Sequence, residues 1–95
     1  MKKLEFYVGG VDQNGIPEPL TKKLIEAVIA SHECDSYSIF EGTGYWKGEQ
    51  EPTFKIEIIG NMRNTEIDLI ASSLKGALNQ EAVLVVESDV SMYIV

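Results

Sequence analysis

The sequence predicts a small α+β domain in which a four-stranded antiparallel sheet is covered by two helices, in the order β-α-β-β-α-β. Three observations lead to this prediction. Short segments with period-two alternation occur near the start and in the middle of the chain, two amphipathic segments follow a helical period, and turn residues separate them. Since each helix has one apolar stripe, both stripes must pack on the same sheet, which gives a two-layer sandwich.

The first strand is expected over 3–8, where Leu4, Phe6 and Val8 alternate with polar residues. Gly9-Gly10 ends it, and the loop that follows contains Asp12-Gln13-Asn14-Gly15, which is turn chemistry rather than a calcium loop. From Leu20 the apolar residues recur at helical spacing, and this pattern predicts a helix of about three turns that fades at Ser31.

Alternation returns over 36–41 and 53–59, so these segments are the second and third strands. The eleven residues from Gly42 to Pro52 connect them as a long hairpin, whose ends are able to extend the strands and shorten the loop. A second helix is expected to be capped by Asn64 or Thr65 and to stop at Asn79. We attribute Gly76, inside this helix, to close packing on the sheet.

The continuous apolar run over 82–86 predicts a last strand that is central or buried on both faces. Ser88-Asp89 interrupts it before a second apolar run over 91–95. Either the strand continues through a bulge or a short fifth strand follows. We expect this apolar C-terminal segment to pair with the sheet or with a neighbouring subunit.

Composition limits the classes of function. Ninety-five residues make one domain (1–95), and 44% apolar with 24% charged residues is typical of a globular chain. Fifteen acidic against eight basic residues give a net charge of −7, which argues against nucleic-acid binding. With one cysteine, no export signal and no long apolar run, we expect a cytoplasmic protein that does not enter the membrane.

The strongest functional candidate is the hairpin from Gly42 to Pro52. Its glycines permit close approach, Tyr45 and Trp46 offer stacking surfaces, and Lys47, Glu49 and Glu51 add charge. Its spacing fits neither a Walker loop nor a dinucleotide fingerprint. Trp46 therefore either packs back on the sheet or across a subunit interface, or it contacts a ligand or partner.

The other clusters are weaker. His32 and Cys34 lie two residues apart at a helix end without an orienting third group, so we read His32 as interacting with the last carbonyls of the helix. Ser72 and Ser73 are read as helix surface without a partner base. We predict no catalytic residues, no metal site and no cofactor.

The β-α-β-β-α-β order with a glycine-rich loop between strands two and three resembles the ferredoxin-like, PII-like proteins. This likeness implies a trimer that binds nucleotides or other small ligands between subunits, through the loop that corresponds to Gly42–Pro52. The chain departs from that family in its shorter loop and in lacking a recognisable PII nucleotide-binding motif. The segment from Tyr37 to Thr53 also resembles uncharacterised small proteins of bacteria and their phages, which carry a G-x-W/Y-x-G…E hairpin before the third strand.

Three function hypotheses follow. The leading one is a non-enzymatic binding or regulatory module that self-associates and contacts a small molecule or protein through the hairpin. An alternative is an acidic inhibitor of a host protein, phage-encoded, which requires clustered carboxylates. The third is a small enzyme with a pocket near His32.

Overall fold

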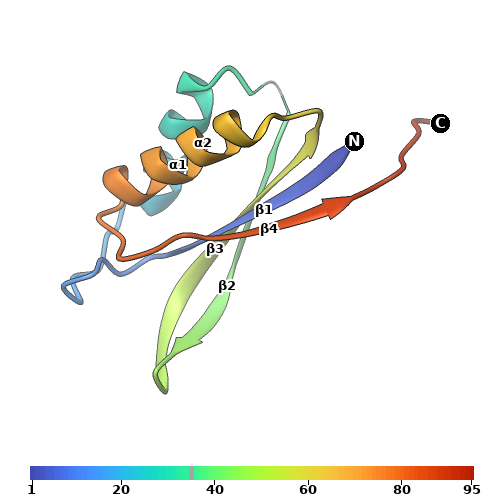
Figure 1. Cartoon of the computed structure of the whole chain (residues 1–95). Helices are drawn as coiled ribbons and strands as arrows, with labels where there is room; N and C mark the ends of the chain where they lie inside the picture. The colour runs from blue at the N-terminus through green and yellow to red at the C-terminus, as the bar shows by residue number, and fades with distance from the viewer. Residues whose placement is uncertain (35) are drawn as a thin grey trace.

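The computed structural model describes residues 1–34 and 36–95, and within them it has the predicted order of elements (Figure 1). Their bounds in chain order are β1 Lys2–Gly9, α1 Thr21–Ser31, β2 Ser38–Trp46, β3 Glu49–Gly60, α2 Asn64–Ala77 and β4 Leu84–Asp89. The strands form one sheet in the order β2-β3-β1-β4, and all neighbouring pairs are antiparallel. This confirms the two-layer α+β sandwich.

Both helices cover one face of the sheet and leave the other face without a helix (Figure 1). The core lies between the layers because alternate residues of the central strands point toward the helices. Phe6 of β1 is opposite Ile56 of β3, and both are fully buried against apolar residues of the helices such as Ile25 and Leu74. In the part of the chain described, no helix is long and apolar enough to cross a bilayer.

Strand β4 does not lie where the sequence predicted. It is an edge strand rather than a central one, and Leu84 is 61% exposed. The apolar run is misleading because only one face of β4 meets the helices. Leu84 and Val86 pair with Tyr7 and Glu5 of β1, whose side chains lie on the face without helices. The pairing of Leu84–Asp89 with β1 is continuous through Ser88, so the expected bulge is absent from this ladder.

Residues 90–95 form no strand in the structure, so the alternative of a fifth strand is also wrong for the described chain. The amide of Val90 donates to the carbonyl of Met1, and the following residues extend away from the sheet (Figure 1). Tyr93 and Ile94 are 86% and 89% exposed. Pairing of this segment with its own sheet is therefore not observed, and pairing with a neighbouring subunit stays a prediction.

Helix α2 ends at its C-terminus as predicted, but its N-terminal cap differs from the prediction. The N-cap residue is Arg63, whose side chain makes no capping hydrogen bond, so the expected caps Asn64 and Thr65 are wrong. Asn79 does end the helix, with a left-handed φ of 48° that a short polar side chain tolerates. Gly76 is exposed, and a Cβ added there would meet nothing within 4 Å, so close packing does not explain this glycine.

The loop after β1 is fixed to the end of α2. One carboxylate oxygen of Asp12 accepts hydrogen bonds from the amides of Asn14 and Ile16, both at 2.9 Å, which forms the predicted turn. The side chain of Gln80 accepts from the amide of Gly9 at 3.1 Å and donates to the carbonyl of Val11 at 3.0 Å. These bonds set where β1 ends, and therefore how far β2 and β3 extend beyond it.

Candidate functional site

The hairpin between β2 and β3 is almost entirely strand. The ladder continues through Thr43 opposite Pro52 to Trp46 opposite Glu49, so the predicted eleven-residue connection shrinks to the turn Lys47-Gly48. Both turn residues have positive φ, 50° and 79°, as a two-residue type I′ turn requires. This turn suits the right-handed twist of the flanking strands, which explains why the glycine-rich segment continues the ladder.

The outer part of this hairpin, residues 43–52, extends past the end of β1. The pairing of β1 with β3 stops at Gly9 opposite Thr53, and one further hydrogen bond joins the amide of Gly10 to the carbonyl of Pro52 at 2.8 Å. Beyond these contacts β2 and β3 pair with each other as a two-stranded ribbon (Figure 1). Tyr45 is 72% exposed and Trp46 is 61% exposed. The option that Trp46 packs back on its own sheet is therefore wrong, because β1, the next strand of the sheet, ends at Gly9 and most of the Trp46 side chain is exposed.

The tip brings some of the predicted site residues together and separates others. Trp46 and Glu49 are directly opposite, so their side chains share a face of the ribbon, and alternation places Glu51 on that face too. Lys47 Nζ lies 5.7 Å from the centre of the Trp46 ring. Tyr45 projects from the opposite face, so a single flat ligand does not contact both aromatic rings from one side.

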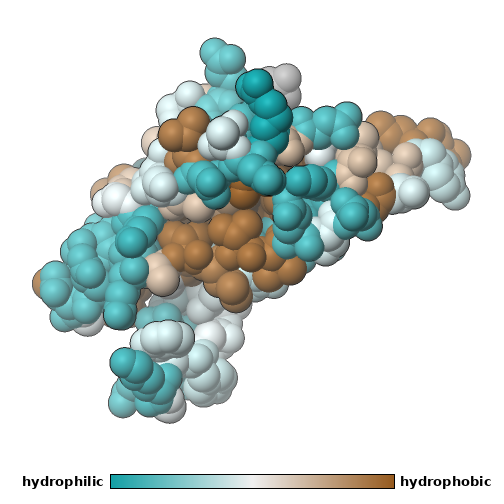
Figure 2. All heavy atoms as spheres, viewed as in Figure 1, coloured by the Kyte–Doolittle hydropathy of each residue, from teal (hydrophilic) through white to brown (hydrophobic). Residues whose placement is uncertain are grey.

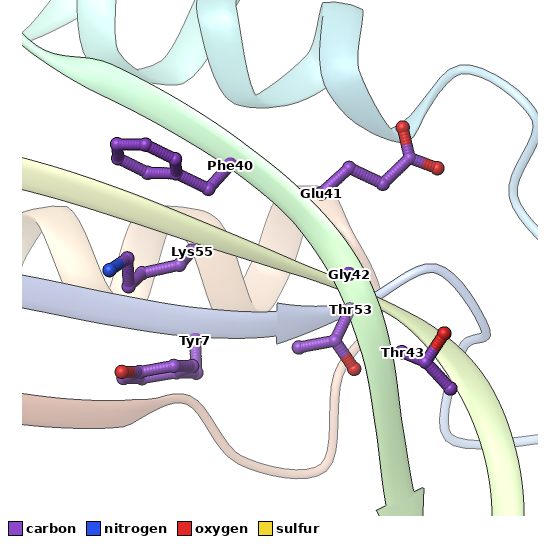
Figure 3. Close-up of a pocket in the computed structure, with 7 residues that line it drawn as sticks. All are labelled: Tyr7, Phe40, Glu41, Gly42, Thr43, Thr53 and Lys55. Atoms are coloured by element: carbon purple, nitrogen blue, oxygen red, sulfur yellow. The ribbon is translucent and has the colours of Figure 1, made fainter.

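A shallow hollow of about 270 Å³ lies next to the ribbon, on the sheet face that has no helix (Figure 3). Three strands contribute to it, and its lining residues are Tyr7, Phe40, Glu41, Gly42, Thr43, Thr53 and Lys55. Gly42 leaves part of the hollow open, since a Cβ added there would meet nothing within 4 Å. Phe40 at the hollow and Trp46 at the tip lie on the same face of β2, with Gly42 and Gly44 between them.

The positive charge of Lys55, which lines the hollow, is balanced by two neighbouring carboxylates. Lys55 Nζ lies 3.5 Å from a carboxylate oxygen of Glu5 and 3.5 Å from one of Glu57, and the hydroxyl of Tyr7 donates to Glu5 at 3.2 Å. Burial lowers the pKa of Lys55, but the hydrogen bond and charge of Glu5 and the charge of Glu57 outweigh it and raise that pKa. Lys55 is therefore held protonated, which suits it to binding and not to acting as a base.

The hollow was not predicted from the sequence, although a signal for it existed. Alternation places Tyr7 and Lys55 on the face opposite the core, and the antiparallel order of β1 and β3 places them side by side. The sequence does not reveal that Phe40 of β2 lies beside Tyr7 and Lys55, because the register of β2 against β3 depends on the two-residue turn.

The segment around His32 differs from the prediction. His32 Nε2 lies 3.0 Å from the hydroxyl oxygen of Ser73 on α2, so the ring links the helices instead of contacting helix carbonyls. Ser73, read as surface without a partner, is the residue it meets. The thiol of Cys34 lies 4.0 Å from the main-chain carbonyl of His32. In residues 1–34 and 36–95, no group of three or more His, Cys, Asp or Glu side chains is arranged to hold a metal ion.

Comparison with known proteins bears on the fold. A scan against protein-family models gives no match, and a search of curated proteins gives no significant match. Among solved structures, a DUF3240 family protein from Shewanella baltica is similar with a TM-score of 0.60 and 9% identity, over 99% of this chain and 94% of that one. CutA1 from Oryza sativa is similar with a TM-score of 0.55 and 15% identity, over 99% of this chain and 84% of that one.

These likenesses extend over nearly the whole chain, but their identities are low enough that they show the fold alone. They confirm the ferredoxin-like architecture. The predicted resemblance to PII-like proteins is supported at the level of the fold and not by sequence.

Proposed function

We propose that this chain is a non-enzymatic binding or regulatory module that acts as a homo-oligomer and contacts a ligand or partner through the Gly42–Pro52 hairpin. One observation carries the proposal. The ribbon holds Tyr45 and Trp46 in the solvent beyond the end of β1, where they contribute to no core. Large exposed aromatic side chains on a rigid turn are the usual anchors of recognition surfaces.

The helix-free face of the sheet supports self-association. The register places Leu84, Tyr7, Lys55 and Phe40 in one row across the four strands. Leu84 and Phe40, at the two ends of this row, are each at least half exposed. Figure 2 shows hydrophobic side chains gathered below the helices, where β4 passes in front of the other strands in Figure 1. The centre of this face is charged, since Lys55 interacts with Glu5 and Glu57, and its exposed apolar side chains lie at the two edges of the sheet. Covering these apolar edges with a second copy removes them from water, which favours self-association.

The chemistry of the hollow supports binding over catalysis. Its cation is paired with Glu5 and Glu57 and is kept charged, so Lys55 itself presents neither a base nor a nucleophile to a ligand. A planar or cationic group is a suitable partner for Trp46, because Glu49 and Glu51 supply negative charge on the same face of the ribbon.

Native mass spectrometry of the protein purified from cells tests the proposal, since it reports subunit number and retained ligand together. The informative variant is Trp46→Ala. Its control is Leu69→Ala, which removes an exposed apolar side chain of α2. We expect Trp46→Ala to weaken the observed binding by roughly thirtyfold, since an anchor residue contributes about 2 kcal/mol.

Both variants are expected to melt close to the wild type, because neither side chain belongs to the core. The proposal is wrong if Trp46→Ala matches the wild type in subunit number, in stability and in every bound species.

A further inference from the structure

The outer edge of β2 carries little of the protection that exposed sheet edges usually have. Natural edge strands are shielded by charged side chains, prolines, bulges or short length, because unpaired N–H and C=O groups attract another strand. Strand β2 is nine residues long, and Glu41 is its one charged residue. Its partner β3 is on its other side, so the outer row of backbone groups faces solvent.

One glycine leaves space beside this edge. Gly42 stands between Phe40 and Trp46 on the same face of β2, and the site of a Cβ on Gly42 is open space. The Cβ position of Gly44 is instead filled by the side chain of Thr53 on β3, so close packing within the chain explains that glycine. Glycine inside a strand often marks a place where another backbone comes close. The edge of β2 therefore resembles a prepared docking site for an extended segment.

The chain itself contains a segment of matching chemistry. Residues 91–95 read Ser-Met-Tyr-Ile-Val, which are predominantly strand-forming residues, and they follow β4 without a ladder partner in the described structure. Tyr93 and Ile94 are almost fully exposed, and Figure 2 shows this apolar end as a separate hydrophobic region. Such a segment is stabilised by pairing with another edge.

This segment does not reach β2 of its own chain. Strands β2 and β4 are at opposite edges of the sheet, and the C-terminal segment and the hairpin tip extend from opposite ends of it (Figure 1). The alternative docking place for this segment is the free edge of β4 in a second copy. It carries Glu87 and Asp89, and the incoming segment itself follows Asp89, so like charges oppose that pairing.

We infer that residues 91–95 of one copy add as a strand to the outer edge of β2 in a second copy, and bring Tyr93 and Ile94 against the aromatic residues of its hairpin. The hairpin site is then composite, since a neighbour supplies one of its walls. This inference rests on the proposed function, because it specifies how the copies associate at the proposed site.

The test compares the full chain with a variant that ends at Val90, which keeps the bond between Val90 and Met1. Amide hydrogen exchange is measured over residues 38–46 and over 84–89 under conditions where the full chain is oligomeric. We expect truncation to speed exchange about tenfold in 38–46 and to leave 84–89 unchanged, since the lost hydrogen bonds belong to β2. Unchanged exchange in 38–46, or a change confined to 84–89, overturns the inference.

A second measurement guards against a truncated chain that is merely less stable. A synthetic peptide covering 89–95 is added to the truncated protein, and exchange in 38–46 is measured again. The control peptide carries Tyr93→Pro, which removes a backbone donor from the added strand. The unmodified peptide is expected to restore protection and the proline peptide is not; equal effects of the two contradict strand addition.

The two proposals fail separately. If Trp46→Ala abolishes binding while truncation changes nothing in 38–46, the hairpin is the binding site and the C-terminal segment does not complete it. If truncation changes 38–46 while Trp46→Ala changes nothing, strand addition holds and the ligand-binding role of the hairpin is lost.

Discussion

The ammonium nitrogen of Lys55 lies 4.7 Å from the centre of the Phe40 ring, which joins β3 to β2 on the face without helices. The same nitrogen interacts with the carboxylates of Glu5 and Glu57. One side chain therefore connects the three strands that line the hollow. Its protonation state determines whether these contacts hold.

Replacing Lys55 with methionine is expected to lower stability at neutral pH and to have no effect at very high pH. The folded-state pKa of Lys55 is raised, so its contribution is fully present below the unfolded value of about 10.4 and is lost as the pH rises through the folded value. The urea midpoint, measured from pH 7 to pH 12, checks this. Lys22→Met, on the exposed side of α1, is the control and should show no such pH dependence.

Asp12→Ala is expected to loosen the loop after β1 at neutral pH. Hydrogen bonds from the amides of Ile16 and Asn14, with one from the Asn79 side chain, lower the pKa of Asp12 against a smaller opposing effect of burial. A lowered pKa means that the stabilisation is present above about pH 3.9 and disappears as the pH falls through the folded value.

The urea midpoints of wild type and Asp12→Ala should therefore differ at pH 7 and converge in acid. Asp12→Asn retains a side-chain acceptor for the same turn, so it should lose less stability than the alanine variant. A difference between wild type and alanine variant that persists undiminished at pH 2 would contradict this explanation.

Gln80→Ala is expected to destabilise the fold by about 1–3 kcal/mol, because it leaves the part-buried amide of Gly9 without its acceptor and removes a donor from Val11. A change of this size lowers Tm by about 4–8 °C per kcal/mol in a domain of this length. Differential scanning calorimetry measures it. Gln50→Ala, on the exposed ribbon, should stay within about 0.5 kcal/mol of wild type.

Gly48→Val is expected to disrupt the tip of the hairpin while sparing the core. The φ of Gly48 is 79°, and a side chain in this region costs about 1–2 kcal/mol. Gly42→Val is the matched control, since Gly42 lies in extended strand with open space for a side chain. Chemical denaturation should separate the two variants, and equal stabilities would show that the two-residue turn is not under this constraint.

The layers and the order of the elements were predictable because alternation in β1 and helical spacing in α1 are strong signals. The extent of β2 was not. Gly42 and Gly44 are typical of loops, yet they lie in strand, because the turn Lys47-Gly48 permits tight pairing of the residues before it with those after it. Tertiary pairing here outweighs local preference.

The position of β4 was mispredicted for a related reason. A continuous apolar run usually means burial on both faces, but Leu84 faces the surface without helices. An apolar residue at such a place looks the same in the sequence whether a helix or a second subunit covers it. Of the site, the sequence indicated Trp46 and the neighbouring carboxylates, whereas the pairing of Lys55 with Phe40 depends on a register that no single-strand pattern contains.

The two-stranded ribbon beyond Gly9 has a consequence for how the protein can change over time. No buried core residue lies in 43–52, so substitutions at the tip are nearly independent of the packing that holds the domain together. Tip sequences can therefore diversify with little loss of folding stability, which makes this ribbon suitable for grafting a foreign recognition sequence between Thr43 and Pro52.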